Sequence, residues 1–217
     1  MKNKKEITKE FITSSVEKLD KADVALQDIP DMKLYMEQLT DFIDSHAGGA
    51  KRTDSEGASV QRVFSKAMIN NYTKAGLLNP PDKKKYNREH IILLLLINQL
   101  KNVLSINDIK LLFAPILKNM DSTEVNDNII SIEDIYETFL ELKNDEYKDA
   151  GQDFENKFKI IKEKTGKISN PDNQDLAEVF LTVMMLVAEA NVAKRLAEDI
   201  IDAFLKKDEA NEKTENI

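Results

Sequence analysis

Apolar residues recur three and four positions apart over most of the chain, and segments with Pro, Gly and Asn separate these periodic stretches. Spacing of this kind is typical of amphipathic helices. Gly and Pro are scarce, at 6 and 5 residues, so few turns are expected. We therefore predict a mainly α fold, with helices over about 5–25, 34–43, 66–74, 88–103, 105–115, 131–165 and 170–207.

Capping residues and breakers mark the ends of the middle helices. Ser65 can cap the helix that follows it, and Gly76 suits the position after its last turn. Asn87 caps the next helix. Ser105–Asp108 is a variant of the capping box, and the helix it starts is expected to end near Pro115.

The C-terminal third is predicted to hold two long helices. The first starts at Ser131, is weakened at Asn144-Asp145 and stops at Gly166. Asn170-Pro171 is a strong start signal for the second, because proline suits the first helical position. From Val179 to Ala193 this helix is apolar nearly all round. Such a helix is buried either in a core or in a subunit interface.

Composition restricts the chemistry that the chain can perform. Cysteine is absent, which excludes disulfides, thiolate metal sites and a cysteine nucleophile. The only histidines, His46 and His90, have no ligand spacing, and no phosphate-binding, dinucleotide-binding or zinc motif is present. We therefore expect a protein that is not an enzyme, with no catalytic residues, no cofactor and no metal, and nothing indicates a small-molecule effector.

The location of the protein is predicted to be cytoplasmic. The residues before Phe11 are charged and do not form a secretory leader. The longest apolar run, Ile91–Ile97, has 7 residues, whereas a membrane span needs about 20. No association with a membrane is expected.

Charge is unevenly distributed along the chain. The total is −8, but residues 51–101 carry 10 Lys/Arg and 4 Asp/Glu, a net charge of +6, between flanks with net charges of −3 and −11. A basic middle between acidic flanks is what a DNA-binding module joined to an acidic partner domain would have. Charge fluctuation along helical surfaces is the other interpretation.

The most specific motif lies between Asn70 and Tyr86. Asn-Asn-Tyr ends a short helix, Lys-Ala-Gly-Leu-Leu-x-Pro follows, and Lys-Lys-Lys-Tyr precedes the next helix. About twenty residues on, Ser105 opens Ser-Ile-Asn-Asp-Ile-Lys-Leu-Leu. In this order, Val60 to Pro115 resembles the MerR-type head, a winged helix-turn-helix. The matching positions are Tyr72, Gly76, Leu77, Leu78, Pro80, Tyr86, Ser105, Ile106, Ile109 and Leu112.

The motif is similar, more closely, to a group of bacterial proteins of unestablished function that share the Asn-Asn-Tyr-x-Lys-Ala-Gly-Leu-Leu core. It also departs from the MerR pattern. That family has Arg-Tyr at the positions of Asn70-Asn71, and its wing is longer than Pro80–Tyr86. Its first two helices are joined by a turn of a few residues, whereas here a loop at 46–59 is inserted between them.

The resemblance implies a sequence-specific, DNA-binding transcriptional regulator with double-stranded DNA as its partner. A recognition helix enters the major groove by its N-terminal part, asparagine can bond adenine, and lysines neutralise phosphate. The predicted DNA-binding residues are Lys66, Asn70, Asn71, Lys74, Lys83, Lys84, Lys85 and Arg88. Exposed or capping positions would equally explain the two asparagines, and a solvated turn would explain the lysine triplet.

The predicted organisation is an N-terminal helical segment (1–33), the MerR-like head (34–117), a C-terminal helical domain (131–207) and a disordered tail (208–217). A homodimer through the C-terminal helices is expected, because a two-fold protein reads a two-fold site. Burial of the apolar helix within one chain is the alternative. The competing function is a protein–protein interaction module that keeps the head as a scaffold, which the acidic total charge and the short wing favour.

Overall fold

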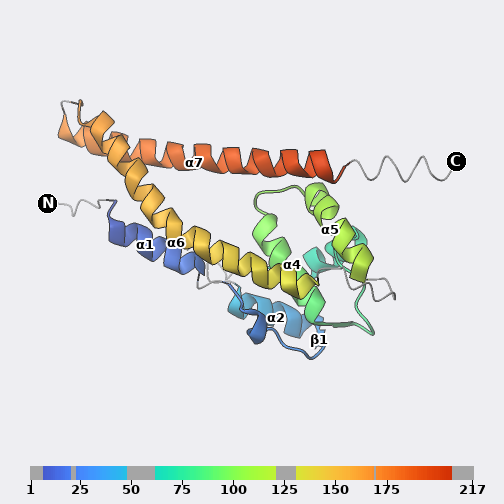
Figure 1. Cartoon of the computed structure of the whole chain (residues 1–217). Helices are drawn as coiled ribbons and strands as arrows, with labels where there is room; N and C mark the ends of the chain where they lie inside the picture. Colours follow the sequence, from blue (N-terminus) through green and yellow to red (C-terminus); the bar gives the residue numbers. More distant parts are fainter. Residues whose placement is uncertain (1–6, 21–22, 48–61, 121–130, 169, 207–217) are drawn as a thin grey trace.

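The computed structural model describes residues 7–20, 23–47, 62–120, 131–168 and 170–206. Within these residues the protein is mainly helical and has one two-stranded sheet, so the mainly α prediction is confirmed. Figure 1 shows a cluster of short elements and two long helices. One of these, α6 (Ile132–Thr165), crosses the cluster, and the other, α7 (Pro171–Phe204), runs back over it.

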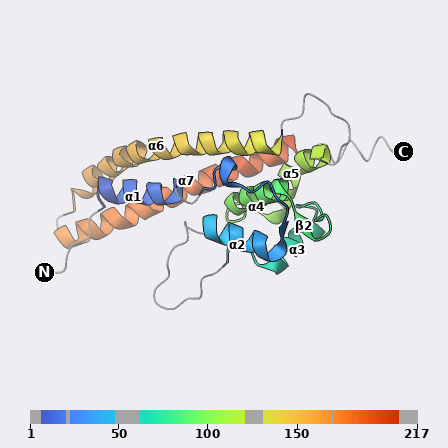
Figure 2. The same cartoon turned by 90° about the horizontal axis from the view of Figure 1, so that it is seen from below.

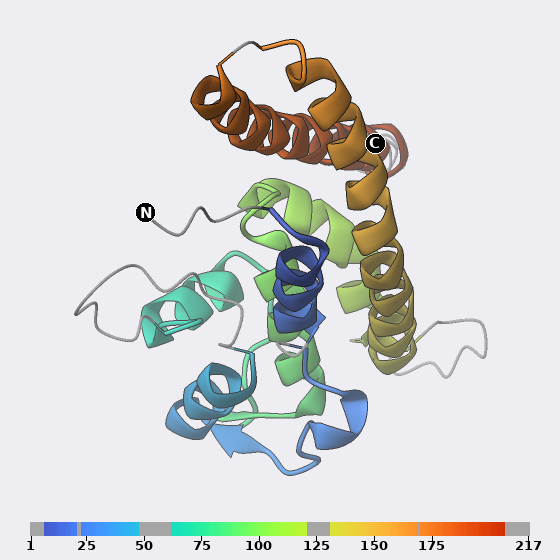
Figure 3. The ribbon, with the colours of Figure 1, turned by 90° about the vertical axis from the view of Figure 1, so that its left-hand side faces the viewer.

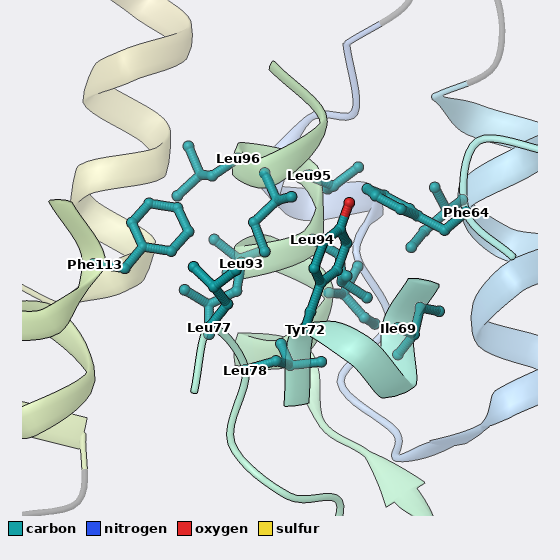
Figure 4. Packing of buried hydrophobic residues seen from close by; sticks show 14 of the residues in the cluster. Phe64, Ile69, Tyr72, Leu77, Leu78, Leu93, Leu94, Leu95, Leu96 and Phe113 are labelled. Atoms are coloured by element: carbon teal, nitrogen blue, oxygen red, sulfur yellow. The ribbon is translucent and has the colours of Figure 1, made fainter. Parts of the chain in front are cut away.

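The centre of the core is α4 (Arg88–Leu100), in which the residues Ile91–Ile97 are all buried. A helix that is apolar all round needs neighbours on every side. Here α2 (Met36–His46) and α6 pack against it, and Phe113 of α5 (Ile106–Met120) joins the same cluster. Figure 4 shows the side chains of α4 pointing in several directions into this cluster. The longest apolar run of the sequence is therefore the central core helix.

Two short strands, which the sequence analysis did not predict, hold the head together. β1 (Leu34–Tyr35) precedes α2, and β2 (Lys85–Tyr86) precedes α4. The strands pair antiparallel, with Leu34 opposite Tyr86 and Tyr35 opposite Lys85. With 2 residues each, they are too short for an alternating pattern to be visible in the sequence. Between them in the chain lie α2 and α3 (Lys66–Lys74), which are neighbours beside α4 in Figure 3.

The predicted caps of the head are confirmed. The hydroxyl of Ser65 accepts a hydrogen bond from the backbone N–H of Met68 at 3.1 Å. The side chain of Asn87 accepts one from the backbone N–H of His90 at 3.2 Å. Gly76 has a φ of +74°, a left-handed conformation that lets the chain leave α3 without the strain of a side chain.

One predicted helix end is wrong, and one predicted weak point does not interrupt its helix. α5 does not end near Pro115 but continues to Met120, because Phe113 and Leu117 on either side of the proline are both buried in the core and hold the helix there. α6 runs without a break through Asn144-Asp145, where Lys148 pairs with Asp145 at 2.9 Å on the exposed side. The predicted tail at 208–217 and most of the predicted loop at 46–59 lie outside the described residues.

The N-terminal residues pack along α6. α1 (Lys9–Asp20), shorter than the predicted helix over 5–25, lies against α6, and a 3₁₀ turn η1 (Leu26–Asp28) follows (Figure 2). Lys143 of α6 pairs with Asp23 at 2.6 Å and donates to the Gln99 side chain of α4 at 3.2 Å. This largely buried cluster joins the start of the chain, the core helix and α6.

The last helix, α7, is covered on one face and at its end. Near its start Thr182 is buried against α6, and Glu189 pairs with Lys157 at 3.0 Å. At its C-terminal end Ile201 is buried beside α5. Between these contacts the apolar side chains are exposed, so burial of Val179 to Ala193 within one chain, one of the two predicted alternatives, is wrong.

Candidate nucleic-acid interface

The polar candidates of α3 share one exposed face. Lys66, Asn70 and Lys74 are four residues apart, so they form a single ridge along the helix, and all three side chains are exposed. Asn71 is exposed on the flank of this ridge, and Ala67 lies between the polar positions. The four predicted contacts of this helix are therefore brought together on a surface with no bulky apolar residue.

The opposite face of α3 fixes the helix to the core. Ile69 and Tyr72 are buried there, and Tyr72 meets Phe64 edge to face with ring centroids 5.9 Å apart (Figure 4). Burial raises the pKa of Tyr72. A helix that is held by its apolar face presents its polar ridge as a rigid unit.

The connection between α3 and β2 ends in a tight turn, Asp82–Lys85, which we call the basic turn. The backbone N–H of Lys85 donates to the carbonyl oxygen of Asp82 at 2.8 Å. Lys83 and Lys84 have φ values of 48° and 66°, so both central residues are left-handed, as in the tight turns of hairpins. Both lysines are exposed at the tip, where their charges face solvent.

Lys85, the third lysine of the triplet, has a different environment. It belongs to β2, is half-buried, and its ammonium lies 5.1 Å from the centre of the Tyr35 ring. A cation in this position is attracted to the face of the ring. Of the three lysines, Lys83 and Lys84 therefore expose their side chains at the tip of the turn, whereas Lys85 packs on the sheet.

A chain of contacts places the start of α3 near the basic turn. Lys66 pairs with Glu37 in the first turn of α2, and this bond lowers the pKa of Glu37. Two residues before Glu37 is Tyr35, whose backbone pairs with Lys85. The N-terminal end of α3, the N-terminal end of α2 and the basic turn are therefore on one side of the head.

His90 is a structural residue in this part of the head. Its Nε2 lies 3.1 Å from the carbonyl oxygen of Asn79, and its Nδ1 accepts the backbone N–H of Asn87 at 3.2 Å. Burial lowers the pKa of His90, which favours the neutral ring. The ring thereby joins both ends of the segment that carries the basic turn.

Arg88, the last predicted DNA contact, lies apart from this surface. Its guanidinium, 18% exposed, bonds Glu133 at 3.0 Å and Asp31 at 2.9 Å and donates to the carbonyl oxygens of Leu26 and Ile29. These partners lie in the segment before β1 and at the start of α6. Arg88 therefore joins the start of α4 to the segment before β1 and to the start of α6.

Two lysines that the sequence analysis did not select lie at the edges of the surface. Lys33 pairs with Asp82 of the basic turn at 2.7 Å, and this contact lowers the pKa of Asp82. The stem of Lys110 in α5 lies beside Gly76 at the end of α3, since a Cβ on that glycine would be 3.9 Å from its Cε. No local pattern marks either residue, because only the folded chain places them beside α3 and the turn.

The residues just before α3 are fixed to α2. Arg62 pairs with Asp41 at 3.5 Å, and the backbone N–H of Val63 donates to Asp44 at 2.5 Å. Lys101, at the end of α4, donates to the carbonyl oxygen of Val63 at 2.8 Å. Although residues 48–61 lie between α2 and this anchor in the sequence, α3 starts from a defined position.

Among the described residues, no three His, Asp or Glu side chains come together as a metal site requires. The surface consists of amide and ammonium groups, which can donate hydrogen bonds and neutralise anionic charge.

One comparison with known proteins gave a match. A family model described as "Domain of unknown function (DUF1836)" matches residues 24–139, which include the whole head and the start of α6. No curated protein and no solved structure matches the chain.

Proposed function

We propose that the chain, which belongs to the DUF1836 family, is a sequence-specific, DNA-binding transcriptional regulator. The region that matches the family model includes the polar ridge of α3 and the basic turn. The observation that carries the proposal is the exposure of both elements on one side of the head. Lys66, Asn70, Asn71 and Lys74 are on one helix face, and Lys83 and Lys84 are at the tip of the neighbouring turn.

The order of elements supports a head of the MerR-like winged helix-turn-helix type. β1, α2, α3, the basic turn, β2 and α4 follow one another, and β1 pairs with the strand after the turn. In this proposal α2 and α3 are the helix-turn-helix, α3 is the recognition helix, and the basic turn is a short wing. An α-helix fits into the major groove of B-DNA, and the N-terminal part of a recognition helix contacts base edges.

The side chains divide into two classes. Asn70 and Asn71 can each bond adenine through N6 and N7 and would read sequence. Lys74, Lys83 and Lys84 would neutralise phosphates without reading sequence directly. Lys66 pairs with Glu37, and Lys33 pairs with Asp82. Each of these lysines would contribute to DNA binding only by leaving its carboxylate partner for a phosphate group.

The experiment is a binding selection from random duplex DNA, followed by titrations of the selected and a scrambled duplex over a range of salt concentrations. Changing Lys83 and Lys84 together to Ala should weaken binding to both duplexes. It should also flatten the dependence of log affinity on log salt by about 0.9 for each lost phosphate contact. Changing Asn70 or Asn71 to Ala should weaken binding to the selected duplex by about 1–3 kcal/mol and change scrambled binding little.

Lys148→Ala is the matched control, because Lys148 is an exposed lysine of α6 and lies away from the head. It should leave both duplex affinities unchanged. Lys85 is excluded from the substitutions because it packs on Tyr35. An intact protein with no preferred sequence and only weak, salt-sensitive attraction to any duplex would overturn the proposal.

A second candidate is a protein–protein interaction module built on the same head. The observation that favours it is the pairing of Glu37 with Lys66 and of Asp82 with Lys33, since these carboxylates reduce the positive charge that phosphate would meet. The total charge of −8 favours it too. Under this candidate the Asn70 and Lys83–Lys84 substitutions would not separate the selected duplex from the scrambled one.

A further inference from the structure

Tyr35 is exposed, unlike the other aromatic residues of the head that the structure describes. It is 49% exposed at the end of β1. The others are half-buried or buried in the core: Phe42, Phe64, Tyr72, Tyr86 and Phe113. The side chain of Tyr35 is therefore not part of the core, and a substitution there leaves the core intact.

The position of Tyr35 is fixed through its backbone. In the strand pair it lies opposite Lys85, and its N–H donates to the side-chain oxygen of Gln38 in the first turn of α2 at 2.9 Å. Two residues after Tyr35, Glu37 pairs with Lys66 at the start of α3. Tyr35 therefore lies between the N-terminal end of α3 and the basic turn, the two elements that are proposed to contact DNA.

Two hydrogen-bond donors lie beside each other at this position. The ammonium of Lys85 is 5.1 Å from the centre of the Tyr35 ring. Within the described part of the chain, neither this ammonium nor the hydroxyl of Tyr35 has a hydrogen-bond partner. Lys33 and Lys66, in contrast, are each bonded to a carboxylate. The hydroxyl and the ammonium can therefore both donate to an anion without first leaving a partner.

We propose that Tyr35 is a DNA contact, and that its hydroxyl donates to a backbone phosphate that the ammonium of Lys85 neutralises. This inference rests on the proposed function, because it adds a residue to the same surface. Tyrosine and lysine side chains are both among the groups that proteins use to bond phosphate oxygens, and such contacts fix the register of a protein on the duplex. Tyr35 would position α3 without reading sequence.

The contact between the ring and the ammonium prepares the pair for an anion. A lysine that is free in solvent loses rotational freedom when it binds a phosphate. Lys85 is half-buried and already packed on the ring of Tyr35, whereas Lys83 and Lys84 are exposed at the tip. Less freedom is therefore lost when Lys85 binds, which favours it as the cation that acts together with the hydroxyl.

A purely structural role is the alternative. Pairs of side chains across two strands stabilise a sheet, and a cation over an aromatic ring does so as well. The two roles differ in the part of the tyrosine that they need. A stabilising pair needs the face of the ring, whereas a phosphate contact needs the hydroxyl. Tyr35→Phe keeps the ring and removes the hydroxyl, so it separates the two roles.

The experiment uses the full-length chain with the selected and the scrambled duplex, titrated over a range of salt concentrations. Tyr35→Phe should lower the affinity for both duplexes by about tenfold, the effect of losing a hydrogen bond to a charged group. The dependence of log affinity on log salt should not change, because a neutral hydroxyl releases no counterion. Lys85→Gln should weaken binding to both duplexes and flatten this dependence by about 0.9, whereas Lys85→Arg should retain it.

Tyr147→Phe is the matched control. Tyr147 lies in α6, outside the head, and the ammonium of Lys143 is 5.3 Å from the centre of its ring. The control therefore removes the same hydroxyl from the same kind of pair, and both duplex affinities should stay unchanged. Urea denaturation should show that Tyr35→Phe has the free energy of unfolding of the natural chain, since the ring and its contact with Lys85 remain.

The outcomes distinguish this inference from the proposed function. If the natural chain prefers the selected duplex and Tyr35→Phe binds both duplexes as tightly as the natural chain does, Tyr35 has only a structural role and the proposed function stands. A loss of affinity for the selected duplex alone would also overturn the inference, because Tyr35 would then contact a base. A natural chain that prefers no sequence would overturn the proposed function, and this inference with it.

Discussion

The imidazole of His90 and the backbone of Asn79 are joined across the base of the basic turn, with Nε2 donating to the carbonyl oxygen at 3.1 Å. The other ring nitrogen accepts the N–H of Asn87 at 3.2 Å. A ring that donates from Nε2 and accepts at Nδ1 is neutral, and the side-chain oxygen of Asn87 lies against the same Nδ1. Burial lowers the pKa of His90, which favours the neutral ring in the folded protein.

The stability of the head should therefore fall as pH falls. The pKa of His90 is lower in the folded than in the unfolded state, so the unfolded state takes up a proton first. The contribution of His90 is complete above about pH 6.5, the ordinary pKa of histidine, and decreases as pH drops toward the folded pKa. Urea denaturation between pH 8 and pH 5 should show a decreasing free energy of unfolding.

His90→Gln isolates this contribution, because the amide can replace a hydrogen bond but does not titrate in this range. In that variant the decrease in the free energy of unfolding between pH 7 and pH 5 should be smaller than in the natural chain. His46→Gln is the control, since His46 is exposed at the end of α2. Identical pH profiles for the natural chain and His90→Gln would contradict the assignment.

Lys143 should be far more important for stability than other lysines of α6. The side chain of Lys143 is 12% exposed and its ammonium bonds Asp23 and Gln99, so Lys143→Ala leaves the largely buried carboxylate of Asp23 without its cation and with only the Gln99 amide donating to it. Breaking a buried pair in this way costs about 3 kcal/mol. Lys148→Ala, which removes an exposed pair with Asp145, should cost less than about 0.5 kcal/mol. Thermal and urea denaturation of both variants measure the difference, and equal losses would contradict it.

Arg88→Ala should lower stability without changing the response of DNA binding to salt. The guanidinium satisfies the carbonyl oxygens of Leu26 and Ile29 and bonds Glu133, so its loss should reduce the free energy of unfolding by about 2–3 kcal/mol. The salt slope of the folded protein should stay unchanged, because no phosphate contact is lost. A weaker dependence of log affinity on log salt, with unchanged stability, would contradict this assignment and indicate that Arg88 contacts DNA.

What the sequence predicted well was local. The caps Ser65 and Asn87 and the glycine at position 76 each act through bonds to residues three or four positions away, so their meaning is readable along the chain. The division of α3 into a buried face and a polar ridge follows from helical spacing alone. Lys66, Asn70, Asn71 and Lys74 lie on the exposed side of this helix, and their role in binding DNA stays a prediction.

What the sequence could not predict depends on contacts between distant segments. Arg88 resembles a free cation beside a lysine run, and only the fold brings Leu26 and Glu133 to it. The strand pair forms through Leu34 and Tyr86, which are too far apart in the chain for a local signal. Lys33 joins the basic turn through the same pairing.

The basic turn provides the last prediction, because its conformation and its charge favour different residues. Lys83 and Lys84 have positive φ values, which cost a residue with a side chain about 1 kcal/mol each, whereas Asn-Gly is the preferred pair for such turns. Lys83→Asn with Lys84→Gly should therefore raise the free energy of unfolding by about 1 kcal/mol.

The same double substitution removes both charges from the tip, so under the proposed function it should weaken binding to every duplex even as the protein becomes more stable. Lys83→Ala with Lys84→Ala removes the charges but keeps side chains at positive φ, so it should lose affinity to a similar extent without gaining stability. Urea denaturation and DNA titration of the two variants separate conformation from charge. If both variants keep the affinity of the natural chain for DNA, Lys83 and Lys84 do not contact phosphate. DNA binding would then not explain why lysines occupy these two left-handed positions.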